Sequence, residues 1–265
     1  MLTIQQVTQF LEQFAPTRLA EDWDNVGLLV GDRQGQAKAV MTCLTVTPET
    51  VEEAIEQNAD LIVSHHPLPF RPLKRITTDQ VPSKLLWDLV RAEISVYSPH
   101  TGFDSACQGI NQSLGHRLGL NNLKPILPIP DDPQQLGSGR LGVTSETTEL
   151  AGFVATIKHQ FDLPTLQVVG TDQQTVHRVA IACGSGGSFL TAAIESGCDT
   201  FVTGETTFHT ALEAKANGLA LVLLGHYQSE RFAVEMLAEE LSTAFSNSQL
   251  KVWASQQETD PLRFV

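Results

Sequence analysis

The chain has 265 residues, 42% of them hydrophobic, which is enough to bury a core in one large or two modest domains. Its 30 acidic and 17 basic side chains give a formal net charge of −13, which argues against a nucleic-acid backbone as main partner. No stretch approaches the length of a membrane span. Four cysteines, without disulfide or zinc-finger spacing, predict buried, reduced thiols in a cytoplasmic protein: Cys43, Cys107, Cys183 and Cys198.

The first half of the chain alternates strands and helices. Thr3 is typical of an N-cap for an amphipathic helix that Pro16 ends. A Trp-Asp-Asn run follows at 23–25, where ordinary turn chemistry is favoured over the rim of a site. Apolar patterning then predicts strands over 27–31, 39–46, 60–64 and 94–97, and helices over 48–57, 83–91 and 105–118. Strand, helix and strand in quick succession predict a βαβ unit with a parallel sheet.

The second half repeats this alternation after a segment over 121–139 whose four prolines predict a linker. Strands are expected over 139–144, 165–170, 178–182, 198–203, 219–224 and 250–254, with helices near 148–160 and 226–245. A glycine loop at 184–187 could present N–H groups to a phosphate or form a close-packed turn, and the turn is favoured. These patterns predict an α/β fold of two lobes in one compact unit, residues 1–125 and 126–265, with the C-terminal segment able to pack on the first lobe.

Two adjacent histidines, His65 and His66, stand where a buried strand should end, and Pro67 stops the strand. The carboxyl ends of strands in open α/β sheets are where ligands bind, and neutral imidazole is the commonest metal-binding side chain. The pair is therefore a candidate for metal ligation.

An internal repeat extends this observation. At an offset of 139 residues, the chain around His66 aligns with the chain around Glu205. At an offset of 126, His100-x-x-x-Asp104 aligns with His226-x-x-x-Glu230. Each half therefore supplies strand ends with imidazole and carboxylate groups, which predicts two pseudo-symmetric lobes. Separate structural roles for each histidine are the alternative.

The chemistry of these side chains indicates divalent transition metals. Histidine and a carboxylate four residues apart at the start of a helix lie on one face. A mixed nitrogen and oxygen set suits Zn, Mn, Fe, Co or Ni ions rather than Ca²⁺ or soft copper. Five or six ligands exceed the number that one zinc ion takes, so two metal ions are expected, of the kind that activates water for hydrolysis.

Six motifs then indicate a family over nearly the whole chain: Trp23-Asp24-Asn25-Val26-Gly27-Leu28, Ser64-His65-His66-Pro67, His100-Thr101-x-x-Asp104, Gly109-x-Asn111, Thr203-Gly204-Glu205 and Gly225-His226-Tyr227-x-x-Glu230. On these motifs the chain resembles the NIF-three-like family, whose members carry the label GTP cyclohydrolase I type 2 homologue. Two departures, Gly102 for the usual Asn and Ser229 for the usual Thr, remove no ligand.

The resemblance implies two α/β lobes with mixed, largely parallel sheets, a dinuclear metal cleft between them and a toroidal homohexamer. It assigns five metal ligands, with Glu230 bridging: His65, His66, Asp104, His226 and Glu230. His100 would lie close by as a pocket residue. The chain is too short for the inserted domain that longer family members carry.

Two functional hypotheses follow. The first is a metal-dependent hydrolase or cyclohydrolase for a small, nucleotide-like or phosphorylated substrate, with metal-activated water as nucleophile and His100 or Glu205 moving protons. The second is a non-catalytic metal-binding protein that holds a ligand or regulatory partner. A ligand set alone does not discriminate between them.

Overall fold

The computed structural model describes residues 1–132, 134 and 136–263. The chain forms two compact units: unit one combines Met1–Phe103 with Arg231–Val265, and unit two is Asp104–Glu230. Each unit has a mixed sheet with helices, so the predicted α/β class is confirmed. The unit boundaries differ from a division after residue 125, because residues 104–125 pack in unit two and the C-terminal segment joins the sheet of unit one.

Unit one is built on a five-stranded sheet in the order β1-β4-β3-β2-β13, in which only β1 is antiparallel to its neighbour. The strands are β1 (Gly27–Val30), β2 (Ala39–Cys43), β3 (Leu61–Ser64), β4 (Ser95–Ser98) and β13 (Lys251–Ala254). β2, β3 and β4 are buried throughout, as expected for parallel strands covered on both faces.

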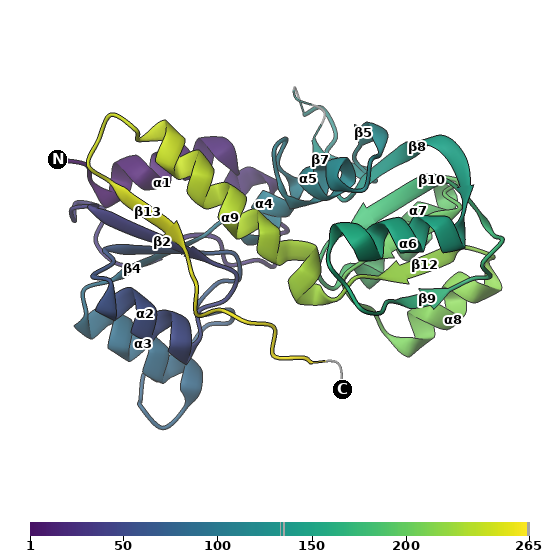
Figure 1. The fold of residues 1–265 in the computed structure, drawn as a ribbon. Helices are drawn as coiled ribbons and strands as arrows, with labels where there is room; N and C mark the ends of the chain where they lie inside the picture. Colours follow the sequence, from purple (N-terminus) through teal and green to yellow (C-terminus); the bar gives the residue numbers. More distant parts are fainter. Residues whose placement is uncertain (133, 135, 264–265) are drawn as a thin grey trace. The chain divides into compact units, whose positions relative to one another are not determined.

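Helices cover both faces of this sheet (Figure 1). α2 (Pro48–Glu56) and α3 (Val81–Arg91) lie on one face, and α1 (Ile4–Phe14) and the later part of α9 (His226–Ala244) lie on the other. Successive side chains of β2 point to opposite faces of the sheet. Met41 belongs to the core with α2 and α3, whereas the Thr42 hydroxyl donates to the Val234 carbonyl of α9 at 2.6 Å. The predicted Thr3 cap is confirmed, as a reciprocal capping box with Gln6.

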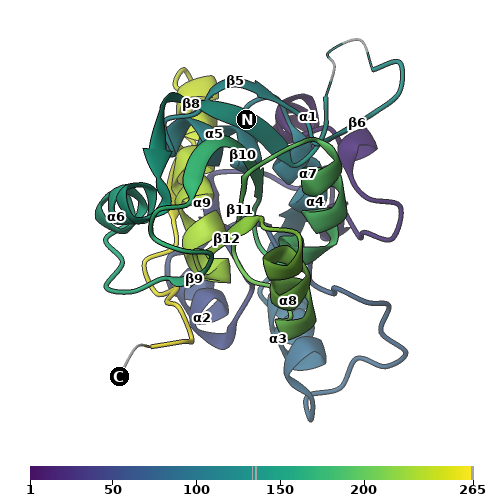
Figure 2. The ribbon, with the colours of Figure 1, turned by 90° about the vertical axis from the view of Figure 1, so that its right-hand side faces the viewer.

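Unit two has a six-stranded sheet in the order β5-β8-β10-β11-β12-β9, of which β10, β11 and β12 are parallel. The strands are β5 (Asn121–Lys124), β8 (Arg140–Glu149), β9 (Gln167–Val169), β10 (Thr175–Ala182), β11 (Thr200–Thr203) and β12 (Ala220–Leu223), and a separate ribbon joins β6 (Leu127–Pro128) to β7 (Gly137–Ser138). The helices are α5 (Ile110–Arg117), α6 (Leu150–Gln160), α7 (Leu190–Glu195) and α8 (Phe208–Ala216). In Figure 2, α7 and α8 lie on the opposite side of this sheet from α6.

The linker expected over 121–139 is in part wrong. Asn121–Lys124 forms the edge strand β5, paired antiparallel with β8, and only part of the segment is irregular. Residues 133 and 135 of that segment lie outside the described residues. The prolines of this segment favoured a linker, and the apolar signal of β5 is too weak to oppose them because the strand is short and mostly exposed.

The internal repeat has a structural counterpart in two aligned aspartates. Asp60 precedes β3 and accepts the backbone N–H groups of Lys38 and Ala39 at 2.7 and 2.9 Å. Asp199 precedes β11 and accepts those of His177 and Arg178 at 2.9 and 2.8 Å. The same carboxylate device therefore ties the start of equivalent parallel strands in each unit.

Two further expectations concern surfaces. Cys43 and Cys183 are buried as predicted, but Cys107 is exposed, because it lies in the turn between α4 (His100–Ser105) and α5. None of the helices in the described part of the chain is both long enough and apolar enough to cross a bilayer.

Candidate metal-binding site

Three imidazoles gather in unit one, in a group that we call the histidine cluster: His65, His66 and His100. His65 and His66 follow β3, and His100 begins α4 directly after β4. The ring centroids are 5.0 Å apart for His65 and His66, 5.1 Å for His65 and His100, and 5.6 Å for His66 and His100. One ring nitrogen from each lies within 4.8 Å of the others, so the cluster could hold a metal ion.

Backbone hydrogen bonds position the adjacent histidines. The N–H groups of His65 and His66 donate to the carbonyls of Cys43 and Leu44 at 2.9 and 2.8 Å, which continues the pairing of β2 with β3. The Ser98 hydroxyl donates to the His65 carbonyl at 2.6 Å from the end of β4. Because three parallel strands end at the same edge, their terminal side chains converge.

A buried carboxylate orients His100. Asp24 lies 2.7 Å from His100 Nδ1 and accepts the hydroxyl and the N–H of Thr101 at 2.5 and 3.1 Å. Burial raises the pKa of Asp24, but the hydrogen bonds from His100 and Thr101 outweigh it and lower the pKa from 3.8 to about 2. An ionised Asp24 favours a proton on Nδ1 of His100, which leaves Nε2 as the basic nitrogen. The Trp-Asp-Asn run is thus part of the site and more than an ordinary turn.

A second set of contacts orients His66, and sequence reasoning missed it. Thr45 Oγ1 lies 2.7 Å from His66 Nδ1. The Glu258 carboxylate accepts the N–H groups of Leu44 and Thr45 at 2.8 and 2.7 Å and lies 3.2 Å from Arg231 Nε. Burial raises the pKa of Glu258. No motif marks Glu258, because it is some 190 residues from His66 in a polar tail.

In unit two, a group that we call the carboxylate cluster surrounds a glycine turn: Asp104, Glu205, His226 and Glu230. His226 Nε2 lies 3.0 Å from Glu230 Oε2, one helical turn along α9, and His226 Nδ1 lies 2.9 Å from Glu205 Oε1. The hydrogen bond to Glu230, which outweighs the opposing effect of burial, raises the pKa of His226 to about 9, and Glu205 adds to this rise. The hydrogen bond from His226 to Glu205, together with one from Ser185, lowers the pKa of Glu205.

The glycine turn at 184–187 supports these side chains. A Cβ atom on Gly184 would lie 2.2 Å from Glu230 Oε1 and 3.4 Å from His226 Nε2, and Gly184 has a φ of +58° that favours glycine. Cys183 Sγ lies 3.2 Å from Asp104 Oδ1, and burial together with the charges of Asp104 and Glu230 raises the pKa of that thiol.

The turn interpretation of this glycine loop agrees with its hydrogen bonds. The Gly184 N–H donates to Ser229 Oγ at 2.9 Å and the Gly186 N–H donates to Thr203 Oγ1 at 3.1 Å. Both N–H groups therefore donate to side chains of the protein, whereas a phosphate cradle would need them to face the ligand.

The donor atoms fit divalent transition metals. Unit one brings three imidazoles together, and unit two pairs one imidazole with a buried carboxylate beside a glycine that leaves room for it. The structure thus groups the predicted residues His65, His66 and His100 in unit one, and Asp104, Glu205, His226 and Glu230 in unit two.

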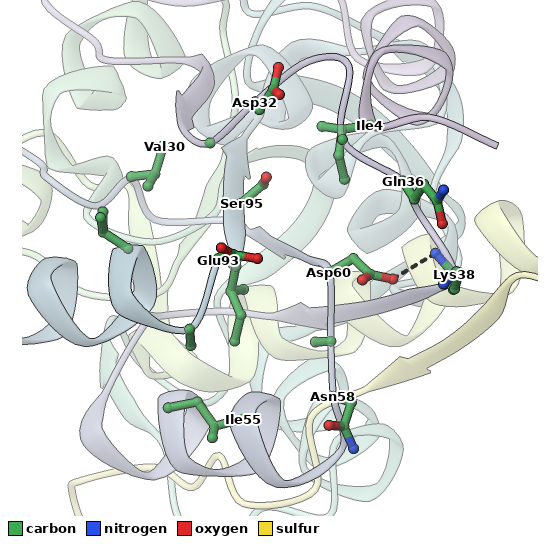
Figure 3. A pocket seen from close by; sticks show the side chains of 16 residues that line it. Ile4, Val30, Asp32, Gln36, Lys38, Ile55, Asn58, Asp60, Glu93 and Ser95 are labelled. Carbon is green, nitrogen blue, oxygen red and sulfur yellow. Dashed lines mark hydrogen bonds between the residues drawn. The ribbon is translucent and has the colours of Figure 1, made fainter. Parts of the chain in front are cut away.

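A cavity of about 920 Å³ in unit one is a different feature (Figure 3). It lies at the opposite, amino edge of β3 and β4, where Asp60 and Ser95 line it together with Asp32 and Glu93. No histidine lines it, so it does not extend the histidine cluster.

Known proteins are similar to this chain in both sequence and fold. The model of the Duf34/NIF3 (NGG1p interacting factor 3) family matches residues 2–261. A protein of Clostridium acetobutylicum named "GTP cyclohydrolase 1 type 2 homolog" is 31% identical, with 99% of each chain covered. "NIF3-like protein 1" of Drosophila melanogaster is 34% identical, with 97% of this chain and 87% of that protein covered. The crystal structure of Staphylococcus aureus protein SA1388 superposes with a TM-score of 0.89 at 28% identity, covering 100% of this chain and 99% of that one.

Proposed function

The chain belongs to the Duf34/NIF3 family, and on that premise we propose that it is a divalent-metal-dependent hydrolase or cyclohydrolase acting on a small molecule. The observation that carries this proposal is the histidine cluster, in which three imidazoles converge and one is held by an ionised aspartate. The pair of Asp24 and His100 is the arrangement of an oriented general base beside the candidate ligands His65 and His66. The label cyclohydrolase on homologous proteins agrees with this class of reaction.

We propose that two ions are held by His65, His66, Asp104, His226 and Glu230, with Glu230 shared by both ions, in one dinuclear cleft. The spacing within the chain supports this set, since His226 and Glu230 are four residues apart on α9, and Asp104 lies four residues after the pocket residue His100 on α4. Three imidazoles and two carboxylates suit Zn, Mn, Fe, Co or Ni.

Bound divalent cations would supply Lewis acidity and lower the pKa of a coordinated water. The protein's own residues then orient ligands and move protons. His100 keeps its Nδ1 on Asp24, so its Nε2 is available to accept a proton. Glu205 accepts from Nδ1 of His226, so it directs Nε2 of that ring toward Glu230 and can relay a proton to solvent.

Metal analysis of purified protein tests this assignment. We expect the wild-type chain to bind two equivalents of divalent metal, and the His66→Ala/Glu230→Ala double variant to bind none. Glu239→Ala, an exposed position on the same helix as Glu230, is the matched control and should retain full metal content. Two equivalents in the double variant would show that the ligand assignment is wrong.

Turnover separates the enzyme from the non-catalytic alternative. Nucleotides and phosphoesters would be screened with Mn²⁺, Fe²⁺ or Zn²⁺ added, and any turnover should disappear in His66→Ala. Full metal loading with no turnover, together with tight binding of a partner, would favour a metal-binding regulatory protein instead.

A further inference from the structure

Two aromatic side chains stand exposed beside the histidine cluster. Trp23 is 63% exposed and Phe70 is 49% exposed, although large aromatic side chains normally bury most of their surface. Their ring centroids are 6.1 Å apart, and each ring also contacts the imidazole of His100, at 6.0 Å from Trp23 and 5.8 Å from Phe70. Only the His100 ring would therefore separate a ligand bound on these aromatic side chains from the candidate metal ligands His65 and His66.

The local structure holds the two rings in place. Trp23 precedes Asp24, which is anchored to His100 and Thr101, and Asn25 Nδ2 donates to the Pro69 carbonyl at 2.8 Å. The loops that carry Trp23 and Phe70 are thus tied to each other and to the start of α4. Because the two rings are already in contact, at an interplanar angle of 40°, a planar ligand would stack on one ring and contact the other at an angle, and would not lie between them.

A concentrated positive charge follows directly after Phe70. Arg71, Lys74 and Arg75 are three of the 17 basic residues of a chain with a net charge of −13, and all three are exposed. Within the described residues, none of the three forms an ion pair or a side-chain hydrogen bond with the protein. In an otherwise acidic molecule, such a segment is where an anionic ligand would be attracted.

We propose that Trp23 and Phe70 form a stacking platform for a planar heteroaromatic ring, and that the segment Arg71–Arg75 binds an anionic group of the same ligand. Aromatic faces stack on heterocyclic bases irrespective of base identity, and arginine pairs with phosphate through two parallel hydrogen bonds. The substrate class is then a nucleotide or a similar phosphorylated heterocycle. This inference rests on the proposed function, since it specifies what the histidine cluster acts upon.

Three probes separate the ring from the anionic group: AMP, adenosine and ribose phosphate. Their binding to the Mn²⁺-loaded full-length chain would be measured by calorimetry, with metal content determined on the same samples. We expect Trp23→Ala and Phe70→Ala each to weaken AMP and adenosine about tenfold and to leave ribose phosphate unchanged. Trp23→Phe keeps an aromatic face and should restore most of the affinity.

The matched control for the platform is Trp87→Ala, because Trp87 is 44% exposed on α3. For the basic segment, the triple variant Arg71→Ala/Lys74→Ala/Arg75→Ala should weaken AMP and ribose phosphate about tenfold and spare adenosine. A triple variant with the same change in net charge, Lys124→Ala/Lys158→Ala/Lys215→Ala in unit two, should bind all three probes as the wild type does.

Several outcomes would overturn the inference. Fully metal-loaded platform variants that bind adenosine and AMP with unchanged affinity would do so, as would equal losses in Trp87→Ala. A changed oligomeric mass with unchanged probe binding would identify the aromatic face as a contact between copies. If the wild-type chain binds no metal, the proposed function itself fails, so the two failures are distinguishable.

Discussion

At the scale of single residues, two carboxylates in separate units each orient a histidine ring. Asp24 lies on Nδ1 of His100, and Glu205 lies on Nδ1 of His226. In each case the carboxylate favours a proton on Nδ1 and so directs Nε2 away from itself, toward Glu230 in the case of His226. Asp24 is buried and Glu205 is exposed, so only Asp24 works without competition from water.

Asp24→Asn tests the importance of that orientation. A neutral amide no longer fixes the ring of His100, which contacts the rings of the candidate ligands His65 and His66, so we expect metal affinity at the histidine cluster to fall about tenfold. Competition with a chelator measures this affinity. Asp32→Asn, in the same unit at the amino edge of the sheet, is the control and should bind metal normally. Equal affinity of Asp24→Asn and wild type would contradict the role assigned to Asp24.

At the scale of elements, the C-terminal strand completes unit one. β13 pairs in parallel with β2, and the residues after it turn onto the Glu53 carboxylate of α2. Glu53 accepts from the Ser255 hydroxyl at 2.5 Å, from Trp253 Nε1 at 3.2 Å and from the Gln256 N–H at 3.1 Å. The residues held by Glu53 directly precede Glu258 in the chain. Glu258 accepts the N–H of Thr45, whose hydroxyl orients His66.

Glu53→Gln should therefore destabilise unit one in a pH-dependent way. Burial raises the pKa of Glu53, but the hydrogen bonds outweigh it and hold the pKa below its ordinary value of 4.5. A carboxyl with a lowered pKa contributes stability above 4.5 and loses it as the pH falls through its folded-state pKa. We expect the variant to lose about 1–3 kcal/mol at pH 7 and less in acid.

Urea unfolding of the wild type and of Glu53→Gln, at pH 7 and in acid below the folded-state pKa of Glu53, measures the difference in their free energies of unfolding. Glu52→Gln changes the neighbouring, exposed carboxylate and should leave stability within about 0.5 kcal/mol of wild type. A constant penalty across the pH range for Glu53→Gln would show that packing, and not the charge of Glu53, holds the tail.

At the scale of the whole molecule, we propose that copies of the chain assemble into the toroidal homohexamer implied by the family resemblance. The helix α8 presents Phe208, 74% exposed, one turn before Leu212, which is also exposed. Adjacent apolar side chains on a surface helix are typical of contacts between subunits.

A hexamer of 28.9-kDa chains would have a mass of about 173 kDa by light scattering after gel filtration. We expect Phe208→Asp to shift the protein toward smaller species, since a buried charge in an interface is costly. Lys215→Asp, at an exposed polar position of the same helix, should not. A monomeric wild-type chain would reject the hexamer.

The sequence by itself determined the α/β class, most of the strands and helices and the residues of both clusters, because apolar periodicity, glycine and proline punctuation and the His-x-x-x-carboxylate repeat are local signals. It missed β5, whose signal is weak because the strand is short and exposed, and it did not place the unit boundary. Only the tertiary structure decided which groups surround the candidate ligands. Asp24 reaches His100 across 76 residues and Glu258 reaches Thr45 across 213, and contacts between such distant segments depend on how strands pair and end, which no local pattern contains.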